Sequence, residues 1–404
     1  MNKHKNIAIA GVGIVGSEVI KYIQENLQYI TDNCMGVVPT IKAIASRTNH
    51  NIKDIQWYND PQKFFDDPEI NLIVELIGGA DGVAYQLVQS ALAKGIDVVT
   101  ANKALIAKHG NSLNDLAKKN NAALHFEASV AGSIPIIKTL NETLATNHIS
   151  EISGILNGTC NFILSLMYDE NMDFDQALQL AQEKGYAEAD PTLDIDGIDA
   201  AHKISIISSI AFKTHIDFNT VKITGIREIQ TSSFEIAKTL KYKIKLIART
   251  FVLNNKIYQY VLPFFIPNSH PLSNINLSLN SLYIKSDLSD TTVLTGPGAG
   301  GKPTSSAIIS DIGDILRKHK RFKTNISNNY QYEKNFDFTQ NYILHFTNND
   351  ILTELKNLFV SKNITIISEK ELNKHHIIII ATNNYNFIAN LKNDYKIEGS
   401  FGIL

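Results

Sequence analysis

The first apolar segment of this chain runs directly into a glycine-rich turn. Residues 7–10 read Ile-Ala-Ile-Ala, and the six residues that follow have the spacing Gly-x-Gly-x-x-Gly. In this spacing the first glycine makes a tight turn, the second lets a pyrophosphate approach the backbone, and the third lets a helix pack closely on the strand. The pattern predicts a dinucleotide site at a helix N-terminus, against the alternative of a purely structural turn. The predicted cofactor-binding residues at this turn are Gly11, Gly13, Ile14, Val15 and Gly16.

Apolar runs and helical stretches alternate over residues 6–120, which is the pattern of a parallel βαβ sheet. The runs are apolar on both faces, as expected for strands that helices cover on each side. The sequence therefore predicts an α/β protein with an N-terminal Rossmann domain, a doubly wound parallel sheet, over residues 1–130. The predicted strands are 7–10, 41–46, 72–77, 97–100 and 124–127, and the predicted helices are 14–30, 82–94 and 103–120.

The pattern changes after the first domain. Residues 131–303 mix helices and strands and predict an α+β domain. A helix at 304–320 follows a second glycine-rich turn, and we expect it to return to the first domain. Residues 322–338 are polar and rich in asparagine, which indicates a linker. Residues 340–404 read strand–helix–strand–strand–helix–strand, the order of a small ferredoxin-like module.

The composition excludes several classes of protein. The 404 residues carry a net charge of −2, which gives no electrostatic reason to expect nucleic acid or an anionic membrane as a partner. No run approaches the roughly 18 apolar residues of a membrane span. A strand turning into a helix explains the N-terminus better than a signal peptide does. With only two cysteines, Cys34 and Cys160, we expect neither a disulfide framework nor a zinc site, and a reducing, cytoplasmic location.

The end of the second predicted strand bears on the choice of dinucleotide. The residue that reads the adenosine ribose is expected there, and the strand ends Ser46-Arg47-Thr48 with no acid at its tip. An arginine suits a 2′-phosphate, so Arg47 favours NADP, with NAD use still possible. The alternative, that Arg47 stacks on adenine or faces solvent, has nearly equal weight.

Two lysines stand where chemistry is expected. Lys103 follows a predicted parallel strand at the carboxyl end where open α/β sheets bind ligands. A solvated surface lysine is the alternative there. The block 185–203 crowds five carboxylates into a turn and ends at Lys203, with Asp199 four residues before it on the same helix face. Such a pair can hold an ammonium group beside a substrate and tune its proton affinity. A nicotinamide site with a positioned acid/base predicts a dehydrogenase.

A second glycine-rich turn spans residues 296–304 and includes Gly300. This turn precedes the helix that is expected to return to the first domain. We therefore favour the interpretation that its backbone lines the site of the nicotinamide or the substrate. The alternative is a flexible linker.

Taken together, these motifs resemble the homoserine dehydrogenase family. The resemblance covers residues 5–320 and follows the family order. It implies reversible reduction of L-aspartate 4-semialdehyde to L-homoserine by NAD(P)H, on the route to threonine and methionine. It also implies that residues 131–303 bind substrate and form a dimer, with a tetramer not excluded. The motifs that carry it are residues 11–16, 75–79, 98–103, 126–132, 154–159, 185–203 and 296–304.

The resemblance also implies roles for individual residues. Lys203 is the proton donor and acceptor, and Lys103 binds cofactor and substrate near the reacting oxygen, although the sequence does not decide which lysine moves the proton. Glu188 binds the amino group of the substrate, Asp199 is a substrate-site carboxylate, and Asp194 orders the same loop. Gly78 and Gly300 join the cofactor-binding residues. Asp190 and Asp196 are better explained by turn or helix-cap chemistry.

A cation site is implied as well. Glu127 and the main-chain carbonyls of Val130, Gly132 and Ile134 match a monovalent cation site, and these oxygen ligands suit a hard ion such as sodium. This chain has Ser133 where the family usually has glycine.

The C-terminal module departs from the family pattern. Members with a regulatory ACT domain carry an Asp-x-Pro-Gly-Val-Leu turn after its first strand, whereas residues 346–352 contain neither proline nor glycine. We therefore predict a degenerate ACT-like module over 340–404 and only weakly expect inhibition by threonine.

Other functions are open to the same residues. One is an oxidoreductase of another amino-acid carbonyl, and a second is a non-catalytic regulator that binds an amino acid on a Rossmann frame. Aspartate-semialdehyde dehydrogenase is disfavoured because its chemistry needs a cysteine nucleophile, and Cys160 is better explained by packing.

Overall fold

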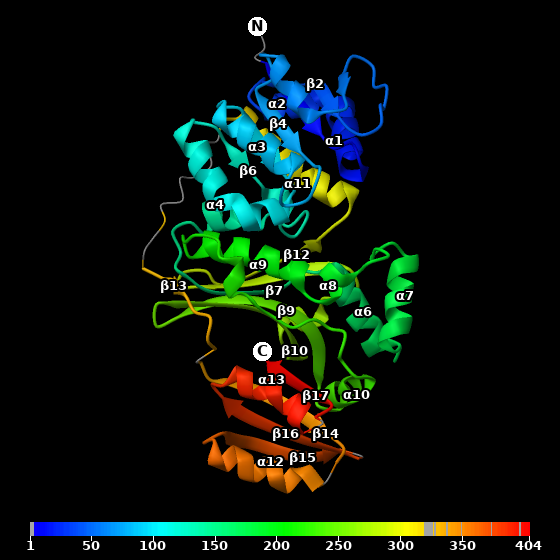
Figure 1. Ribbon diagram of the computed structural model, residues 1–404, viewed down its shortest axis with the longest axis vertical. Coiled ribbons are helices and arrows are strands. Elements are labelled where there is room, and N and C mark those ends of the chain that lie inside the picture. The colour runs from blue at the N-terminus through cyan, green and yellow to red at the C-terminus, as the bar shows by residue number, and fades with distance from the viewer. Residues whose placement is uncertain are drawn as a thin grey trace. The chain divides into compact units, whose positions relative to one another are not determined.

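The structure is a computed structural model that describes residues 4–318, 326, 329–336, 338–348, 350–372, 374–395 and 397–404. The chain forms two compact units, each assembled from three segments (Figure 1). Unit 1 comprises Met1–His148, Ser205–Phe218 and Leu294–Asn328, and unit 2 comprises Ile149–Ile204, Asn219–Val293 and Asn329–Leu404. No helix in the described part of the chain has both the length and the apolar character that crossing a membrane requires.

Unit 1 is built on a six-stranded parallel sheet. Its strand order, β3-β2-β1-β4-β5-β6, is that of a Rossmann dinucleotide-binding fold. Five of the six strands were predicted from sequence. The sixth, β3, is a three-residue edge strand without the apolar run that marks a buried strand. The strands are β1 (His4–Ala10), β2 (Val38–Ala45), β3 (Gln56–Tyr58), β4 (Leu72–Glu75), β5 (Asp97–Thr100) and β6 (Leu124–His125).

Helices cover this sheet. The predicted helix 14–30 is divided at Asn26 into α1 (Ile14–Glu25) and α2 (Leu27–Asn33). The helices α3 (Val83–Ala93) and α4 (Lys103–Lys119) follow the next two central strands, and α5 (Ile136–Lys138) is a short helix beyond β6.

The helix α11 (Gly301–Leu316) lies in unit 1, although it comes late in the chain. Its residues Ala307, Ile308 and Ile312 are buried in one cluster with Ile7 and Ile9 of β1. Figure 1 shows α11, in yellow, among the blue and cyan elements of unit 1. The late segment of the chain therefore completes the core of the Rossmann fold.

Unit 2 contains a long mixed sheet with the order β12-β11-β7-β9-β10-β17-β14-β16-β15. Its centre is an antiparallel pair of twelve-residue strands, β9 (Tyr242–Leu253) and β10 (Lys256–Pro267). The strands on one side of this pair are β7 (Ile149–Ile155), β11 (Leu279–Ser286) and β12 (Asp290–Pro297). The strand β12 is exposed or partly exposed along its whole length, so it lacks the apolar run of a core strand. The short β8 (Lys222–Ile223) pairs with β10.

The helices of unit 2 pack on this sheet. The helix α6 (Gly158–Asp169) is buried along nearly all of its length and contacts β9 and β11. The other helices are α7 (Phe174–Glu183), α8 (Thr192–Ile195), α9 (Ile198–Ala211), whose last residues belong to unit 1, and α10 (Thr231–Thr239). In unit 1, α5 continues into a wide helical turn over Thr139–Thr143.

The C-terminal part of unit 2 has the predicted ferredoxin-like order. Its strands β14 (Gln340–Phe346), β15 (Thr365–Leu372), β16 (His375–Thr382) and β17 (Gly399–Ile403) lie in the order β17-β14-β16-β15, with helices α12 (Asp350–Ser361) and α13 (Tyr385–Asp394) between them in sequence. This part is not a separate sheet, because β17 pairs with β10 through Phe264 and Phe265. Its ACT-like character remains a prediction.

The predicted linker 322–338 is only partly described, since residues 322–325, 327, 328 and 337 lie outside the described residues. In its second half, β13 (Gln331–Tyr332) pairs with the start of β10, and the rings of Phe336 and Phe338 pack against Tyr258. Phe336 therefore belongs to the core of unit 2, and the partly buried Phe338 packs against it.

Candidate active site

The glycine turn between β1 and α1 has the geometry of a dinucleotide-binding turn. Gly11 has φ +101°, and a Cβ at this position would lie 2.5 Å from the carbonyl oxygen of Leu76. A Cβ at Gly16 would lie 2.1 Å from the carbonyl oxygen of Gly11, so the third glycine allows the close packing of helix on strand. At Gly13, in contrast, no described atom beyond the chain neighbours lies within 4 Å of such a Cβ. The open side of the turn is therefore at Gly13, where a pyrophosphate would approach.

The start of α1 is available to a phosphate. Gly13 is its N-cap and makes no side-chain capping bond, and Ile14 is 80% exposed. The unpaired backbone N–H groups and the positive end of the helix dipole make such a terminus an anion site. The turn at 300–301 lies against it, since a Cβ at Gly301 would be 2.9 Å from Cγ2 of Ile14. This contact places Gly300 next to the predicted cofactor turn, while its role in cofactor binding remains a prediction.

A buried carboxylate fixes the loop that contains Gly78. Glu75, at the end of β4, is fully buried and accepts hydrogen bonds from the backbone N–H groups of Ile77 at 2.7 Å and Gly78 at 3.2 Å. Its other oxygen accepts the hydroxyl of Thr100 at 2.6 Å. Gly78 has φ +85° and open space around it. The ends of β4 and β5 are thus joined at the carboxyl edge of the sheet, where Rossmann folds bind their ligands.

Lys103 is the first residue of α4 and directly follows this edge. Asn102 caps the helix by accepting the N–H of Leu105 at 3.1 Å, and its amide donates to the carbonyl of Gly79 at 2.6 Å. Lys103 is partly buried. Its place in unit 1 agrees with the sequence prediction of a lysine at a strand end, while its role remains a prediction.

Arg47 is exposed, two residues beyond the end of β2. The loop around it is ordered, because the hydroxyl of Ser46 donates to the carbonyl of Thr48 at 2.6 Å and accepts the indole N–H of Trp57 at 3.2 Å. The tip of β2, residues 46–48, therefore presents an arginine and no carboxylate.

In unit 2, Lys203 and Asp199 form a buried ion pair on α9. The Nζ of Lys203 donates to Oδ2 of Asp199 at 2.7 Å and to the carbonyl oxygen of Leu156 at 2.8 Å. The two side chains are only 9% and 7% exposed. The i, i+4 spacing read from the sequence thus produces a fixed ammonium group rather than a solvated surface pair.

Asn157 extends this pair into a network. Its amide donates to Oδ2 of Asp199 at 2.9 Å and to Oδ1 of Asp194 at 2.7 Å, while its oxygen accepts the N–H of Cys160 and caps α6. Asn157 was not among the residues predicted from sequence, although an asparagine directly before a helix is a recognisable cap. The amide of Asn280 also donates to the Leu156 carbonyl at 2.9 Å, and no local motif marks Asn280.

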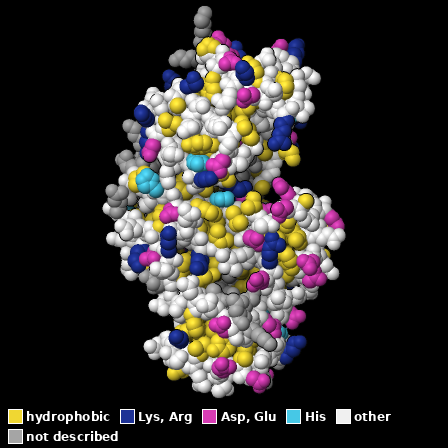
Figure 2. All heavy atoms as spheres, in the orientation of Figure 1, with side chains coloured by type: hydrophobic (Ala, Val, Ile, Leu, Met, Phe, Trp, Pro, Cys, Tyr) yellow, Lys and Arg dark blue, Asp and Glu magenta, His cyan; other side chains and the backbone are white. Residues whose placement is uncertain are grey.

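The acidic turn before α8 is the exposed part of this region. Glu188 is exposed, and its carbonyl accepts the side chain of Gln182 at 3.1 Å. Asp190 accepts the N–H of Thr192 at 3.1 Å, as expected of a turn residue. Asp196 is the C-cap of α8, and its side chain pairs with Arg227. Figure 2 shows acidic side chains gathered on the visible face over α7 and the turn that follows it. Glu188 therefore presents its carboxylate at the surface, in the acidic turn that precedes α8.

Comparison with known proteins identifies the family. The model of the family described as "Homoserine dehydrogenase" matches residues 135–312, and that described as "Homoserine dehydrogenase, NAD binding domain" matches residues 11–127. A homoserine dehydrogenase of Bacillus subtilis is 33% identical over 430 residues, covering 98% of each chain. A homoserine dehydrogenase of Neisseria gonorrhoeae is 40% identical over 319 residues, covering 78% of this chain and 73% of its own. This chain belongs to the homoserine dehydrogenase family.

Solved structures agree. The homoserine dehydrogenase of Thiobacillus denitrificans matches with a TM-score of 0.92 and 33% identity, over 100% of this chain and 98% of its own. A hyperthermophilic archaeal homoserine dehydrogenase in complex with NADPH matches with a TM-score of 0.66 and 29% identity, over 78% of this chain and 98% of its own.

Within the family frame, the residues of the predicted cation site lie together in unit 1. Glu127 is 1% exposed, and its two carboxylate oxygens accept the N–H groups of Ile137 at 2.8 Å and Lys138 at 2.9 Å. The carbonyl of Ile134 accepts the N–H of Ile136 at 2.8 Å. Ser133 donates its hydroxyl to the carbonyl of Pro297 at 3.1 Å, so the serine at this position fixes the loop to the 296–304 turn. The donor set fits a hard cation, because a carboxylate oxygen can accept more than one bond.

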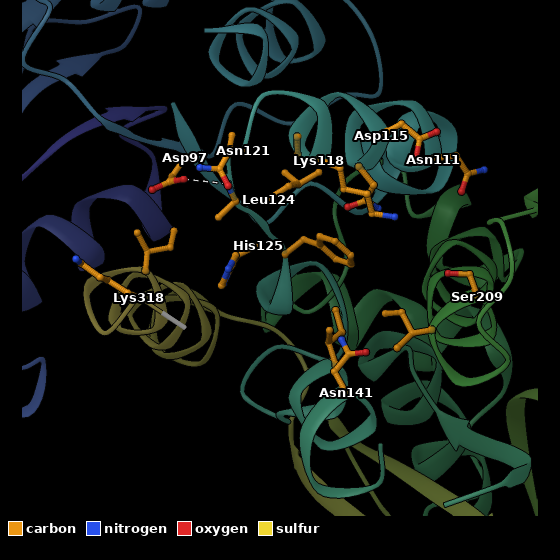
Figure 3. A pocket seen from close by; sticks show the side chains of 18 of the residues that line it. Asp97, Asn111, Asp115, Lys118, Asn121, Leu124, His125, Asn141, Ser209 and Lys318 are labelled. Carbon is orange, nitrogen blue, oxygen red and sulfur yellow. Dashed lines mark hydrogen bonds between the residues drawn. The ribbon is translucent and has the colours of Figure 1, made fainter. Parts of the chain in front are cut away.

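Unit 1 also contains a cavity of about 800 Å³ that the sequence analysis did not anticipate. Figure 3 shows it beside β6, with Asn111, Asp115 and Lys118 of α4, His125 of β6 and Ser209 of α9 around it. None of the predicted site residues lines this cavity. It is therefore distinct from the dinucleotide turn.

Proposed function

We propose that this chain catalyses the reversible, NAD(P)H-dependent reduction of L-aspartate 4-semialdehyde to L-homoserine. The observation that carries the proposal is the buried Lys203 ammonium, held by Asp199 and by the Leu156 carbonyl, in a chain that also has an open dinucleotide turn. A fixed cation in a buried site is the group that the product alkoxide needs.

The proposed chemistry assigns one proton to Lys203. A nicotinamide dinucleotide, when bound, supplies a hydride to the aldehyde carbon or accepts one from the alcohol. As the carbonyl oxygen gains negative charge, Nζ of Lys203 donates a proton to it, and in the oxidation direction the neutral amine takes that proton back. Asp199 positions Nζ through the 2.7 Å bond, and Asn157 holds Asp199 in turn. In this reading Asn157 is a positioning residue.

The substrate is a zwitterion, so it needs both anionic and cationic partners. We assign its ammonium group to the exposed carboxylate of Glu188, with Asp194 ordering the loop through its bond to Asn157. Lys103 is assigned to the reacting oxygen and the cofactor. The positive charge of Lys103 near the reacting oxygen would favour the neutral amine form of Lys203. Lys203 could then act more readily as the base in homoserine oxidation.

We assign the cofactor to Gly11, Gly13, Ile14, Val15 and Gly16, with Gly78 and Gly300 as further backbone contacts. The exposed Arg47 supports a 2′-phosphate at the end of β2, which favours NADP over NAD. A sodium ion held by Glu127 and by the carbonyls of Val130, Gly132 and Ile134 would be structural and would fix the loop before α5.

We further propose that the protein is a homo-oligomer, a dimer formed through the sheet of unit 2 or a tetramer, and that it acts in the cytoplasm. Both cysteines, Cys34 and Cys160, are buried free thiols, which suits a reducing compartment.

Product identification tests the proposed reaction. The protein is incubated with NADPH and L-aspartate 4-semialdehyde, and in parallel with aldehydes of longer and shorter chain length, and the amino-acid product is identified by mass spectrometry. The proposal expects L-homoserine and at least a tenfold preference for that substrate in kcat/KM. Preferred turnover of another aldehyde would assign a related oxidoreductase, and binding of homoserine without any turnover would favour the regulator.

A further inference from the structure

Two histidines and a glutamate that the dehydrogenase reaction does not use meet in the C-terminal part of unit 2. His345 lies near the end of β14, His375 is the first residue of β16, and Glu398 immediately precedes β17. Strand register explains the meeting: His345 pairs with Ile377 and with Gly399, and His375 lies two residues before Ile377 on the same face of the sheet. The cluster therefore belongs to a single packed unit.

The potential ligand atoms converge. Nδ1 of His345 lies 3.9 Å from Oε2 of Glu398, and Nδ1 of His375 lies 3.4 Å from the same oxygen. Each of the three residues offers one ligand atom that lies within 4.8 Å of the other two. Ligand bonds of about 2.0–2.1 Å in tetrahedral geometry separate ligand atoms by about 3.3–3.4 Å. The separations of 3.4 Å and 3.9 Å from the glutamate oxygen are close to that spacing.

Both histidine nitrogens that face the glutamate are unsatisfied. Nδ1 of His345 and Nδ1 of His375 are buried, and neither has a hydrogen-bond partner among the described residues. The side chains of His345 and His375 are 0% and 7% exposed. A buried polar atom without a hydrogen-bond partner lowers the stability of the folded protein. Two such nitrogens facing the carboxylate of Glu398 therefore need an explanation.

The outer contacts of the cluster are those that orient metal ligands. Nε2 of His345 lies 2.9 Å from the buried hydroxyl of Ser233, and a ring N–H donated to this hydroxyl leaves Nδ1 as the lone-pair nitrogen. The carboxylate of Glu398 accepts the hydroxyl of Thr347 at 2.7 Å and that of Ser232 at 3.1 Å. Gly399 makes room for the His345 ring, because a Cβ there would lie 2.2 Å from its Nε2.

A plain ion pair between one histidine and the glutamate explains the cluster less well, because it leaves Nδ1 of the other histidine without a hydrogen-bond partner among the described residues. A neutral imidazole nitrogen offers a lone pair, which is what a metal ligand requires.

We propose that His345, His375 and Glu398 form a binding site for Zn²⁺ or a similar divalent transition metal, with the remaining coordination position open to solvent. Two imidazole nitrogens and one carboxylate oxygen are a donor set that such ions bind. Glu398 is 28% exposed and lines a cavity of about 400 Å³, which gives the ion a path to the site. The expectation of no zinc site rested on the cysteine count, and this donor set needs no cysteine.

The proposed ion has a structural consequence. It would fasten β14, β16 and the start of β17 to one another, and through Ser232 and Ser233 it would fasten them to α10. Figure 1 shows α10 beside β14 and β17, in agreement with these hydroxyl contacts. Metal binding would thus stabilise the C-terminal part of unit 2 without contributing to hydride transfer.

The test uses the untagged full-length protein, freed of metal with a chelator and then dialysed. Calorimetric titration with Zn²⁺ and absorption spectroscopy with Co²⁺ are expected to show one ion per chain. Substitutions H375N and E398Q are expected to weaken the affinity by about 100-fold or more, whereas H376N, on the opposite face of the same strand, should leave it within about threefold. Binding of Zn²⁺ should also raise the Tm of the wild-type protein and not that of H375N.

Circular dichroism checks that each variant is folded. If a ligand variant does not fold, S233A keeps all three ligands and is expected to weaken binding by roughly 10- to 100-fold, as loss of an outer-shell partner does. The proposal is wrong if the folded wild-type protein binds no Zn²⁺ saturably at micromolar concentration. It is equally wrong if the folded ligand variants, or S233A where those do not fold, bind as tightly as the wild type.

Discussion

Replacing Lys203 by methionine separates its chemical role from its structural role. Methionine keeps most of the aliphatic stem but removes the ammonium group, and with it the 2.7 Å bond to Asp199 and the 2.8 Å bond to the Leu156 carbonyl. The Leu156 carbonyl keeps the amide of Asn280 as a donor. Asp199 keeps the amide of Asn157, but its buried carboxylate loses the ammonium group that balances its charge.

The two expected effects have different magnitudes. Loss of a general acid lowers kcat by about 10²- to 10⁴-fold, or roughly 3–5 kcal/mol in the activation barrier. Removing one partner of a buried ion pair lowers the free energy of unfolding by about 3–5 kcal/mol. The double variant K203M/D199N removes both charges. It should therefore recover much of the stability, because no unpaired buried charge remains, while its kcat stays as low as that of K203M.

The assay combines homoserine oxidation, urea unfolding and NADPH binding by fluorescence on the wild type, K203M and the double variant. NADPH affinity should remain within about threefold in all three, because Lys203 is assigned to proton transfer and not to cofactor binding. A kcat for K203M within tenfold of the wild-type value would refute the proton-transfer assignment. Recovery of kcat in the double variant would do so as well.

Four further outcomes follow from the same structure. G16A should lower NADPH affinity by tenfold or more, because its Cβ would lie 2.1 Å from the Gly11 carbonyl oxygen, and fluorescence titration measures this. R47A should raise the KM for NADP by about tenfold and leave that for NAD nearly unchanged; equal changes would remove the arginine from phosphate recognition. E188A should raise the KM for homoserine with a smaller change in kcat, and an unaltered KM would exclude this glutamate from the substrate site. Burial lowers the pKa of Lys245 to about 7, so the unfolded chain binds more protons between about pH 7 and 10.5 and stability should rise with pH there, by at most about 1.4 kcal/mol per pH unit. Urea unfolding at several pH values should show this slope in the wild type and a flatter one in K245M.

The sequence predicts the parts of this fold whose signals are local. The strands of the Rossmann sheet are read correctly because residues such as Ile7 and Ile9 are buried between two helical layers and leave continuous apolar runs. The edge strand Gln56–Tyr58 leaves no such run. The pairing of β17 with β10 joins residues about 140 positions apart, between Phe264 and Gly402, and no local pattern specifies it.

In the candidate site, too, contacts with a local sequence signal can be predicted, and contacts that depend on tertiary packing cannot. The Lys203–Asp199 pair is predictable because its i, i+4 spacing fixes a shared helix face. The role of Asn280 is not, because its contact with the Leu156 carbonyl depends on tertiary packing over 124 residues. His345, His375 and Glu398 also converge only through strand register, which is why the sequence analysis did not group them.

The most direct test of the central claim is the steady-state oxidation of L-homoserine, followed by the absorbance of the reduced nicotinamide, with NADP and NAD in parallel. The account predicts turnover, with a higher kcat/KM for NADP than for NAD. A folded protein that binds NADPH but turns over homoserine with neither dinucleotide would contradict it.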